Sequence, residues 1–167
     1  MSAVTESFGE LVLASWKCEL SFLELLDNAS RLELAGVAQL SAVLYQTWLS
    51  RNTSPYQHAV YFNLGATLAT LGDLAGAENA YRQAVAISPS FIQPRLNLGL
   101  LLERGGNVDA AKAEWRWVVD NGPRDEQNKA LVVLALNHLG RVQELAKEFQ
   151  ASLETLSQSL LLDSNQP

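Results

Sequence analysis

Two asparagines, Asn63 and Asn97, stand 34 residues apart, and each directly precedes a Leu-Gly pair. The carboxamide of asparagine carries hydrogen-bond donors and an acceptor, so it can hold a peptide group whatever side chain the bound residue has. Packed helices lie roughly 8–10 Å apart, and an extended chain advances about 3.3 Å per residue. A row of such amides would therefore contact roughly every third residue of an extended ligand.

Asp27 and His138 take the position of the two asparagines in the flanking parts of the chain. Alternatively, the amides bridge helices or face water. The residues expected beside them in a groove are Ala59, Phe62, Ala66, Ala69, Thr70, Gln93, Leu96, Leu100, Glu103 and Arg104. Such a groove would be largely apolar with polar edges. Either an apolar partner segment fills it, or neighbouring helices of the same chain cover it.

Residues suited to catalysis are scarce. His58 and His138 are the only histidines, and no group of His, Cys, Asp and Glu has the spacing of metal ligands. The sequence contains no glycine-rich phosphate loop and no nucleophile motif. We therefore expect no catalytic residue, no metal and no cofactor, and a chain that is not an enzyme.

The composition favours helices and excludes some classes of partner. The 167 residues are 48% hydrophobic, and no apolar run is long enough to span a membrane. The formal net charge is −6 without a basic cluster, which argues against nucleic acid and anionic membranes as partners. Because Cys18 is the single cysteine, a disulfide framework is excluded and a cytoplasmic location is expected.

Two gapless segments of 34 residues, 58–91 and 92–125, repeat one pattern. Small residues recur where two helices must approach closely, an aromatic residue recurs beside them, and glycine and proline mark the turns. The matched pairs are Asn63/Asn97, Gly65/Gly99, Gly72/Gly106, Ala77/Ala111, Tyr81/Trp115 and Pro89/Pro123. Asp73 and Asn107 are expected to cap the second helix of each segment.

A third unit is expected over 126–166. A strict step of 34 residues would put Gly140 at the turn. A shift of seven residues instead puts Gly140, Ser152 and Leu156 at the close-packing glycine, small and aromatic positions. We prefer the shifted register, which implies a long first helix from near Asp125 to Ala146.

The chain before residue 58 contains a degenerate unit over 20–55. Here Gly36, Ser41 and Tyr45 stand where Gly72, Ala77 and Tyr81 stand later. Residues 5–17 are expected to form an N-terminal helix that covers the end of the array. The whole chain, 1–167, is thus expected to be one domain.

These repeated positions resemble tetratricopeptide repeats. The resemblance implies an all-α, right-handed solenoid of about three to four helix–turn–helix units plus an N-terminal helix. It also implies a concave groove, lined by the first helix of each unit, that binds a protein or peptide segment. Members that hold the carboxylate terminus of chaperones carry basic residues in this groove. Those residues are absent here, so that activity is disfavoured.

Asparagine before Leu-Gly is also similar to the asparagine ladder of O-linked N-acetylglucosamine transferases, whose groove holds acceptor proteins. More loosely, LNHLGRV and the segment ending SLLLDSNQP are similar to the repeat region of bacterial SPINDLY-type transferases. This implies a non-catalytic module that recruits an acceptor or partner protein, as the N-terminal substrate-recognition part of a glycosyltransferase. The alternative is a stand-alone assembly scaffold or a self-associating adaptor, such as a homodimer.

Overall fold

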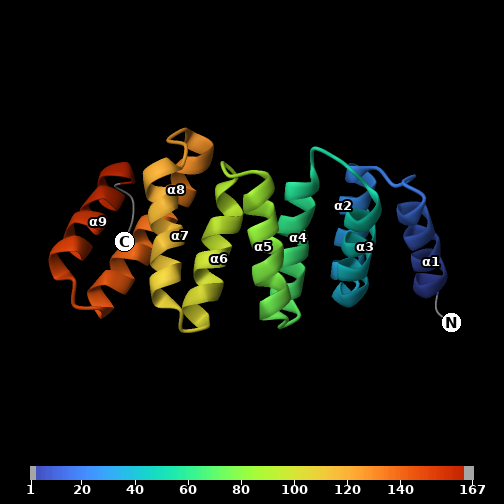
Figure 1. Ribbon diagram of the computed structural model, residues 1–167, viewed down its shortest axis with the longest axis horizontal. Helices are drawn as coiled ribbons and strands as arrows, with labels where there is room; N and C mark the ends of the chain where they lie inside the picture. Colours follow the sequence, from blue (N-terminus) through green and yellow to red (C-terminus); the bar gives the residue numbers. More distant parts are fainter. Residues whose placement is uncertain (1–2, 164–167) are drawn as a thin grey trace. The chain divides into compact units, whose positions relative to one another are not determined.

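The computed structural model describes the backbone of residues 3–163 and the side chains of residues 7–163. All regular structure in this part of the chain is α-helical, as the sequence predicted (Figure 1). The nine helices of the described residues are α1 (Ala3–Trp16), α2 (Phe22–Leu34), α3 (Ala38–Arg51), α4 (Gln57–Thr70), α5 (Leu74–Ile87), α6 (Ile92–Arg104), α7 (Val108–Asn121), α8 (Glu126–Leu145) and α9 (Phe149–Leu162). They form two compact units, Met1–Ile87 and Ser88–Pro167.

In three successive helix pairs, the first helix is followed by a glycine in the left-handed conformation, which other residues adopt only with strain. The φ angles are +77° at Gly36, +84° at Gly72 and +81° at Gly106. The second helix of two of these pairs then begins with the expected cap. The backbone N–H of Gly76 donates to Asp73 Oδ1 at 2.9 Å, and the N–H of Ala110 donates to Asn107 Oδ1 at 3.4 Å.

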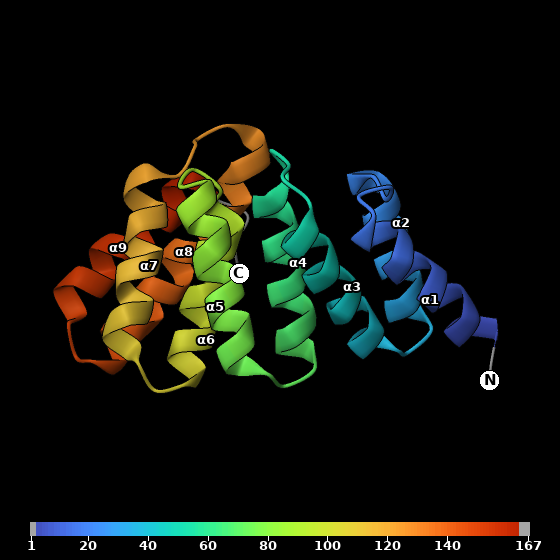
Figure 2. The same ribbon diagram turned by 45° about the vertical axis from the view of Figure 1, so that its right-hand side comes forward.

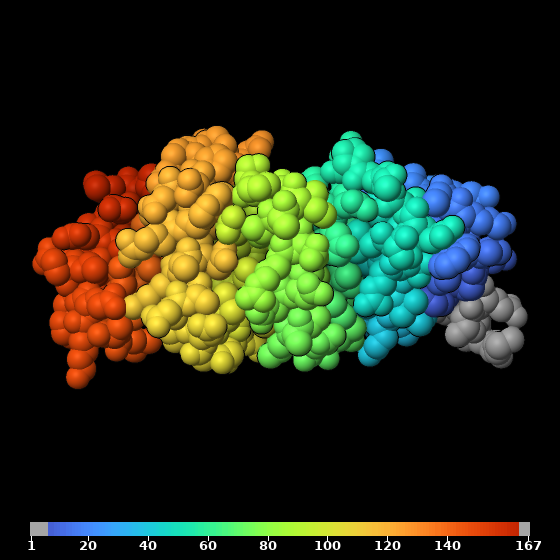
Figure 3. All heavy atoms as spheres, in the orientation of Figure 1, coloured from blue at the N-terminus to red at the C-terminus, as the bar shows by residue number. Residues whose placement is uncertain are grey.

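In the first unit, α2 packs with α3, α4 packs with α5, and α3 joins the two pairs by packing on α4. α1 packs against α3. The indole of Trp48 is buried and donates from Nε1 to the carbonyl of Leu20 at 2.9 Å, so the segment before α2 is held to α3. Figure 3 views this unit from the side on which α3 and α5 lie.

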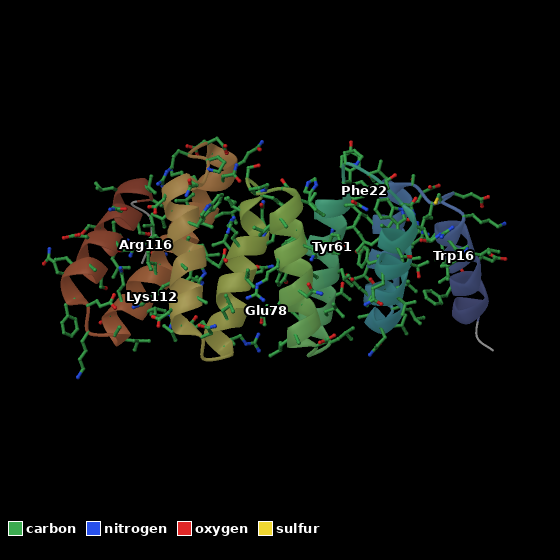
Figure 4. All side chains as sticks on the ribbon, in the orientation of Figure 1. Trp16, Phe22, Tyr61, Glu78, Lys112 and Arg116 are labelled. Carbon is green, nitrogen blue, oxygen red and sulfur yellow. The ribbon has the colours of Figure 1, made fainter. Side chains whose placement is uncertain are left out.

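In the second unit, α6 packs with α7 and α8 packs with α9, and α7 lies against α8 (Figures 1 and 2). α8 is 20 residues long and is capped by Asp125, whose Oδ1 accepts from the N–H of Asn128 at 2.9 Å. Hydrogen bonds from Asn128 lower the pKa of this carboxyl group. An ion pair of 2.6 Å joins Lys112 of α7, labelled in Figure 4, to Glu148 at the start of α9.

Each helix pair of the regular repeats meets at a glycine that lies under a large side chain. A Cβ atom on Gly65 would lie 2.6 Å from the ring of Tyr81, and one on Gly99 would collide with the indole of Trp115. On Gly140 it would lie 2.6 Å from Leu156 Cδ2. Ser152 Oγ also donates to the carbonyl of Gly140 at 2.9 Å. Both contacts of Gly140 are those expected from the shifted register of the third unit.

The last described helix, α9, buries hydroxyl groups and exposes apolar side chains. Ser152, Thr155 and Ser159 are its buried residues. Phe149, Leu153 and Leu160 are 65%, 63% and 52% exposed. Their spacing of four and seven residues places them along one side of the helix, and we call them the α9 stripe. This surface has no cover among the described residues.

Candidate functional site

A hollow of about 200 Å³ opens in the first unit between the end of α2, the start of α3 and one face of α4. We call it the Glu33 hollow, and its lining residues are Glu33, Ala38, Asn63, Ala66, Thr67 and Thr70. Three of these, Asn63, Ala66 and Thr70, are among the residues expected in the groove. The structure therefore brings part of the predicted groove together around a real depression.

The sequence of α4 explains how this face is presented. Residues 63, 66, 67 and 70 are spaced by three or four, so they lie on one side of the helix. Val60, Leu64 and Leu68 lie on the buried side and fix the rotation of the helix against its neighbours. Ala38 and Ala66 have only a methyl group each, and their small size leaves the hollow open.

A carboxylate, that of Glu33, is held at one wall of the hollow by two hydroxyl groups. Ser41 Oγ donates to Glu33 Oε1 at 2.8 Å, and Thr67 Oγ1 donates to the same oxygen at 2.7 Å. Ser41 and Thr67 are buried, whereas Glu33 stays exposed. Hydroxyl donors from α3 and α4 thus fix the position of the carboxylate and leave it open to solvent.

The charge of Glu33 has no cationic partner among the described side chains. Arg31, which lies on the same helix, pairs with Asp27 at 2.9 Å instead. The charge is also felt by Tyr45. Burial first, and the negative charge of Glu33 second, raise the pKa of the Tyr45 hydroxyl to about 12, and a hydrogen bond with Ser41 opposes the rise.

Asn63 borders the hollow, but one of its two N–H groups is used within its own helix. Its Nδ2 donates to the carbonyl of Ala59 at 2.9 Å. An asparagine amide has a second N–H and an oxygen with two lone pairs. Asn63 can therefore still bind a peptide group, with fewer hydrogen bonds than a wholly free amide would form.

The prediction that Leu96 faces the groove is wrong. Leu96 is 3% exposed and belongs to the core of the second unit. It is aligned with Phe62, which is half-buried and lies 6.1 Å from the ring of Tyr81, between centroids. This position lies one residue before the asparagine, so its side chain points in a different direction around the helix. In the pair of α4 and α5 that direction is toward the second helix, where Phe62 meets Tyr81.

Other predicted residues of the second unit differ in exposure. Gln93, Asn97 and Leu100 are half-buried on α6, and Arg104 is exposed at its end. His138 stacks on Trp115, with ring centroids 5.1 Å apart. Burial first, and the charge of Arg141 second, lower the pKa of His138. Packing against the core thus occupies one face of this imidazole.

Glu33, Ala38 and Thr67 were missed as lining residues. A signal for Glu33 was present: matching Gly36 with Gly72 and Gly106 puts Glu33 at the position of Ala69 and Glu103, both expected in the groove. The degenerate first unit concealed this match.

Two less buried tryptophans each lie against an arginine. Arg51 lies over the ring of Trp16, which is labelled in Figure 4, at 4.3 Å from its centroid. Arg95 lies over the ring of Trp117 at 3.8 Å and pairs with Glu114 at 2.8 Å. Cation–π packing accounts for both side chains without a ligand.

Neither a metal-binding cluster nor a membrane-spanning helix occurs among the described residues. No group of three or more His, Cys, Asp and Glu side chains in this part of the chain could hold a metal ion. Within the same residues, every helix is too short or too polar to cross a membrane.

Comparisons with known proteins agree with this fold. Tetratricopeptide repeat protein 8 of Caenorhabditis elegans is 35% identical over 54 residues, which are 32% of this chain and 11% of that protein. The match thus spans about a tenth of the length of that curated relative.

Solved structures are similar over much more of the chain. MamA has a TM-score of 0.74 at 14% identity, covering 98% of this chain and 96% of that one. A tetratricopeptide repeat protein from Parabacteroides merdae has a TM-score of 0.76 at 16% identity, covering 91% and 55%. YrrB has a TM-score of 0.67 at 16% identity, covering 96% and 81%.

Two family models, both described as Tetratricopeptide repeat, match residues 58–91 and 96–167. The first match has the bounds of the first gapless segment. The helix pairs, their glycine contacts and these matches agree: the chain belongs to the tetratricopeptide repeat family.

Proposed function

We propose that this chain is a protein-interaction module that binds an extended segment of a partner protein along the first helices of its repeats. The Glu33 hollow carries the proposal, because it lies on the first helices α2 and α4 and is lined by Asn63, Ala66 and Thr70. Stacked helical repeats bind partners on such surfaces. YrrB, described as a TPR protein with an unusual peptide-binding site, has the same fold.

Within this proposal, the partner is an acceptor protein brought to an enzyme. The sequence similarity to SPINDLY-type transferases supports such a role, and a cytoplasmic location stays a prediction with it. One observation tests the enzymatic link. If the reading frame does not continue beyond Pro167 into a transferase domain, and the chain co-purifies with no transferase, recruitment for glycosylation is wrong.

Blocking the hollow should weaken partner binding. A photo-crosslinking residue at position 70 identifies the partner, and its affinity is then measured with purified proteins by calorimetry. We expect Thr70→Trp to raise the Kd about tenfold or more, because the indole occupies the hollow from an exposed position (~1.4 kcal/mol or more). Arg82→Trp is the control, because it places the same indole at an exposed site on α5, outside the residues that line the hollow. Equal affinities of both variants and the native chain would place binding elsewhere.

A separate experiment tests the two asparagine amides together. We expect Asn63→Ala combined with Asn97→Ala to weaken binding of the same partner about tenfold, because each amide contributes about 0.5–1.5 kcal/mol as a hydrogen-bonding group. Thermal unfolding of the double variant is measured alongside, so that a loss of folding is distinguished from a loss of binding. Unaltered affinity would show that the amides do not contact the partner.

A second candidate function is assembly through self-association, and the α9 stripe favours it. If the stripe forms an interface, sedimentation velocity should show an oligomer that dissociates in the variant Leu153→Glu with Leu160→Glu. Gln158→Glu adds a charge on the other side of α9 and should leave the oligomer intact. A native chain that stays monomeric at high concentration would contradict this candidate.

A further inference from the structure

The Glu33 hollow has a counterpart in the second unit, in which the equivalent space is filled. Glu103 takes the repeat position of Glu33, counted from Gly106 and Gly36. Arg141 takes the position of Ala66, since each follows the close-packing glycine, Gly140 or Gly65. In the second unit, Arg141 and Glu103 form an ion pair between α8 and α6. In the first unit, the arginine is replaced by a methyl group and the hollow remains.

The surroundings of the two carboxylates differ in a matching way. Ser41 and Thr67 donate to Glu33. The residues at the corresponding sequence positions of the second unit are Ala111 and Val142, which carry no hydroxyl group. Hydroxyl groups are neutral, so they orient the Glu33 carboxylate without cancelling its charge. Glu103 is neutralised by the chain itself, whereas Glu33 is oriented and left charged at the wall of an open space.

We propose that the Glu33 hollow receives a lysine or arginine side chain of the bound partner segment. That cation would form between two chains the pair that Arg141 and Glu103 form within one. The volume supports this, since about 200 Å³ is several times the ~30 Å³ that one water occupies. The formal net charge of −6 also favours a basic partner. The inference rests on the proposed function, because it specifies one residue of the segment bound there.

The size of the effect follows from the exposure of Glu33. Ion pairs open to solvent are modest in strength and weaken with salt. Binding of a cation costs less conformational entropy when the carboxylate is already oriented than when the carboxylate is mobile. We therefore expect a preference of about three- to tenfold for a basic residue over an uncharged one of similar length.

The test uses the full chain and short alanine-rich peptides with lysine, arginine or norleucine at one central position. Affinities and backbone amide shifts are followed by two-dimensional NMR. The basic peptides should bind about three- to tenfold more tightly than the norleucine peptide and shift the amides of Asn63, Ala66 and Thr67. Glu33→Gln should abolish the preference. Glu103→Gln is the matched control and should keep it, because that carboxylate is already paired.

A second variant tests the internal comparison. Ala66→Arg should place a guanidinium on Glu33 and abolish the preference for basic peptides, whereas Ala66→Met adds length without charge. If Ala66→Met abolishes the preference as fully as Ala66→Arg does, bulk and not charge is responsible, and the proposed pairing is wrong.

The remaining outcomes separate the two proposals. If lysine, arginine and norleucine peptides bind equally, and Thr70→Trp weakens all three, the basic-residue inference is wrong and the binding groove stands. If no peptide shifts any amide of α4, and the crosslinked partner binds Thr70→Trp normally, both are wrong.

Discussion

Replacing Trp115 by alanine should lower the free energy of unfolding by about 3–5 kcal/mol, the range for removing a large buried aromatic side chain. Trp115 is 0% exposed. Its indole lies over Gly99 on one side and stacks with His138 on another, so its removal leaves a cavity between α6, α7 and α8. Urea denaturation followed by circular dichroism measures the change.

Trp16→Ala is the control for that experiment. Trp16 is 54% exposed and its described contact is with Arg51, so we expect a loss of only about 0.5–1 kcal/mol. Similar losses for both tryptophans would mean that the contact between Trp115 and Gly99 is not a packing centre of the second unit.

Gly99→Ala should also destabilise the chain, by about 1–3 kcal/mol. The sign is informative, because alanine within a helix is normally favoured over glycine by about 1 kcal/mol. Here the added methyl group would collide with the indole of Trp115, which is enclosed and cannot move away. Gly105→Ala is the matched control: the nearest atoms to its Cβ lie at 3.5 Å, an ordinary contact, so stability should hardly change.

The two changes should not be additive. In the background of Trp115→Ala the collision disappears, so Gly99→Ala should become neutral or stabilising, a coupling of the kind that a double-mutant cycle measures. Gly140→Ala should cost less than Gly99→Ala, since it meets the flexible and half-buried side chain of Leu156. A cost for Gly99→Ala that persists without Trp115 would refute the steric explanation.

The helices and their contacts were predictable because each depends on residue types that recur at a fixed spacing. The left-handed glycines at 72 and 106, the caps at Asp73 and Asn107, and the contact of Tyr81 with Gly65 all follow from the repeated pattern. Gly140 was assigned to its packing position because Ser152 and Leu156 also match there. Constraints that act locally, or that several residues must meet together, can be recognised from the sequence alone.

The binding surface was harder to predict, because a small difference in the rotation of a helix about its axis decides whether a side chain faces the groove or the core. Leu96 was placed in the groove, and it turns into the core. The role of Glu33 depends on the hydroxyl groups of Ser41 and Thr67, which come from two other helices. When the first unit is aligned with the second, these two residues are seen only as replacements of alanine and valine. Those replacements could be seen in the sequence, but their convergence on one carboxylate required coordinates.

The α9 stripe has a consequence for how such arrays can grow. Because α9 already presents a line of apolar side chains, a duplicated helix pair joined after it would find a docking surface without any substitution in α9. Each apolar Å² covered in that way contributes about 25 cal/mol. A designed chain with one more copy of residues 58–91 after Leu162 should therefore gain stability on addition of the new repeat, and Leu153→Glu should reduce that gain.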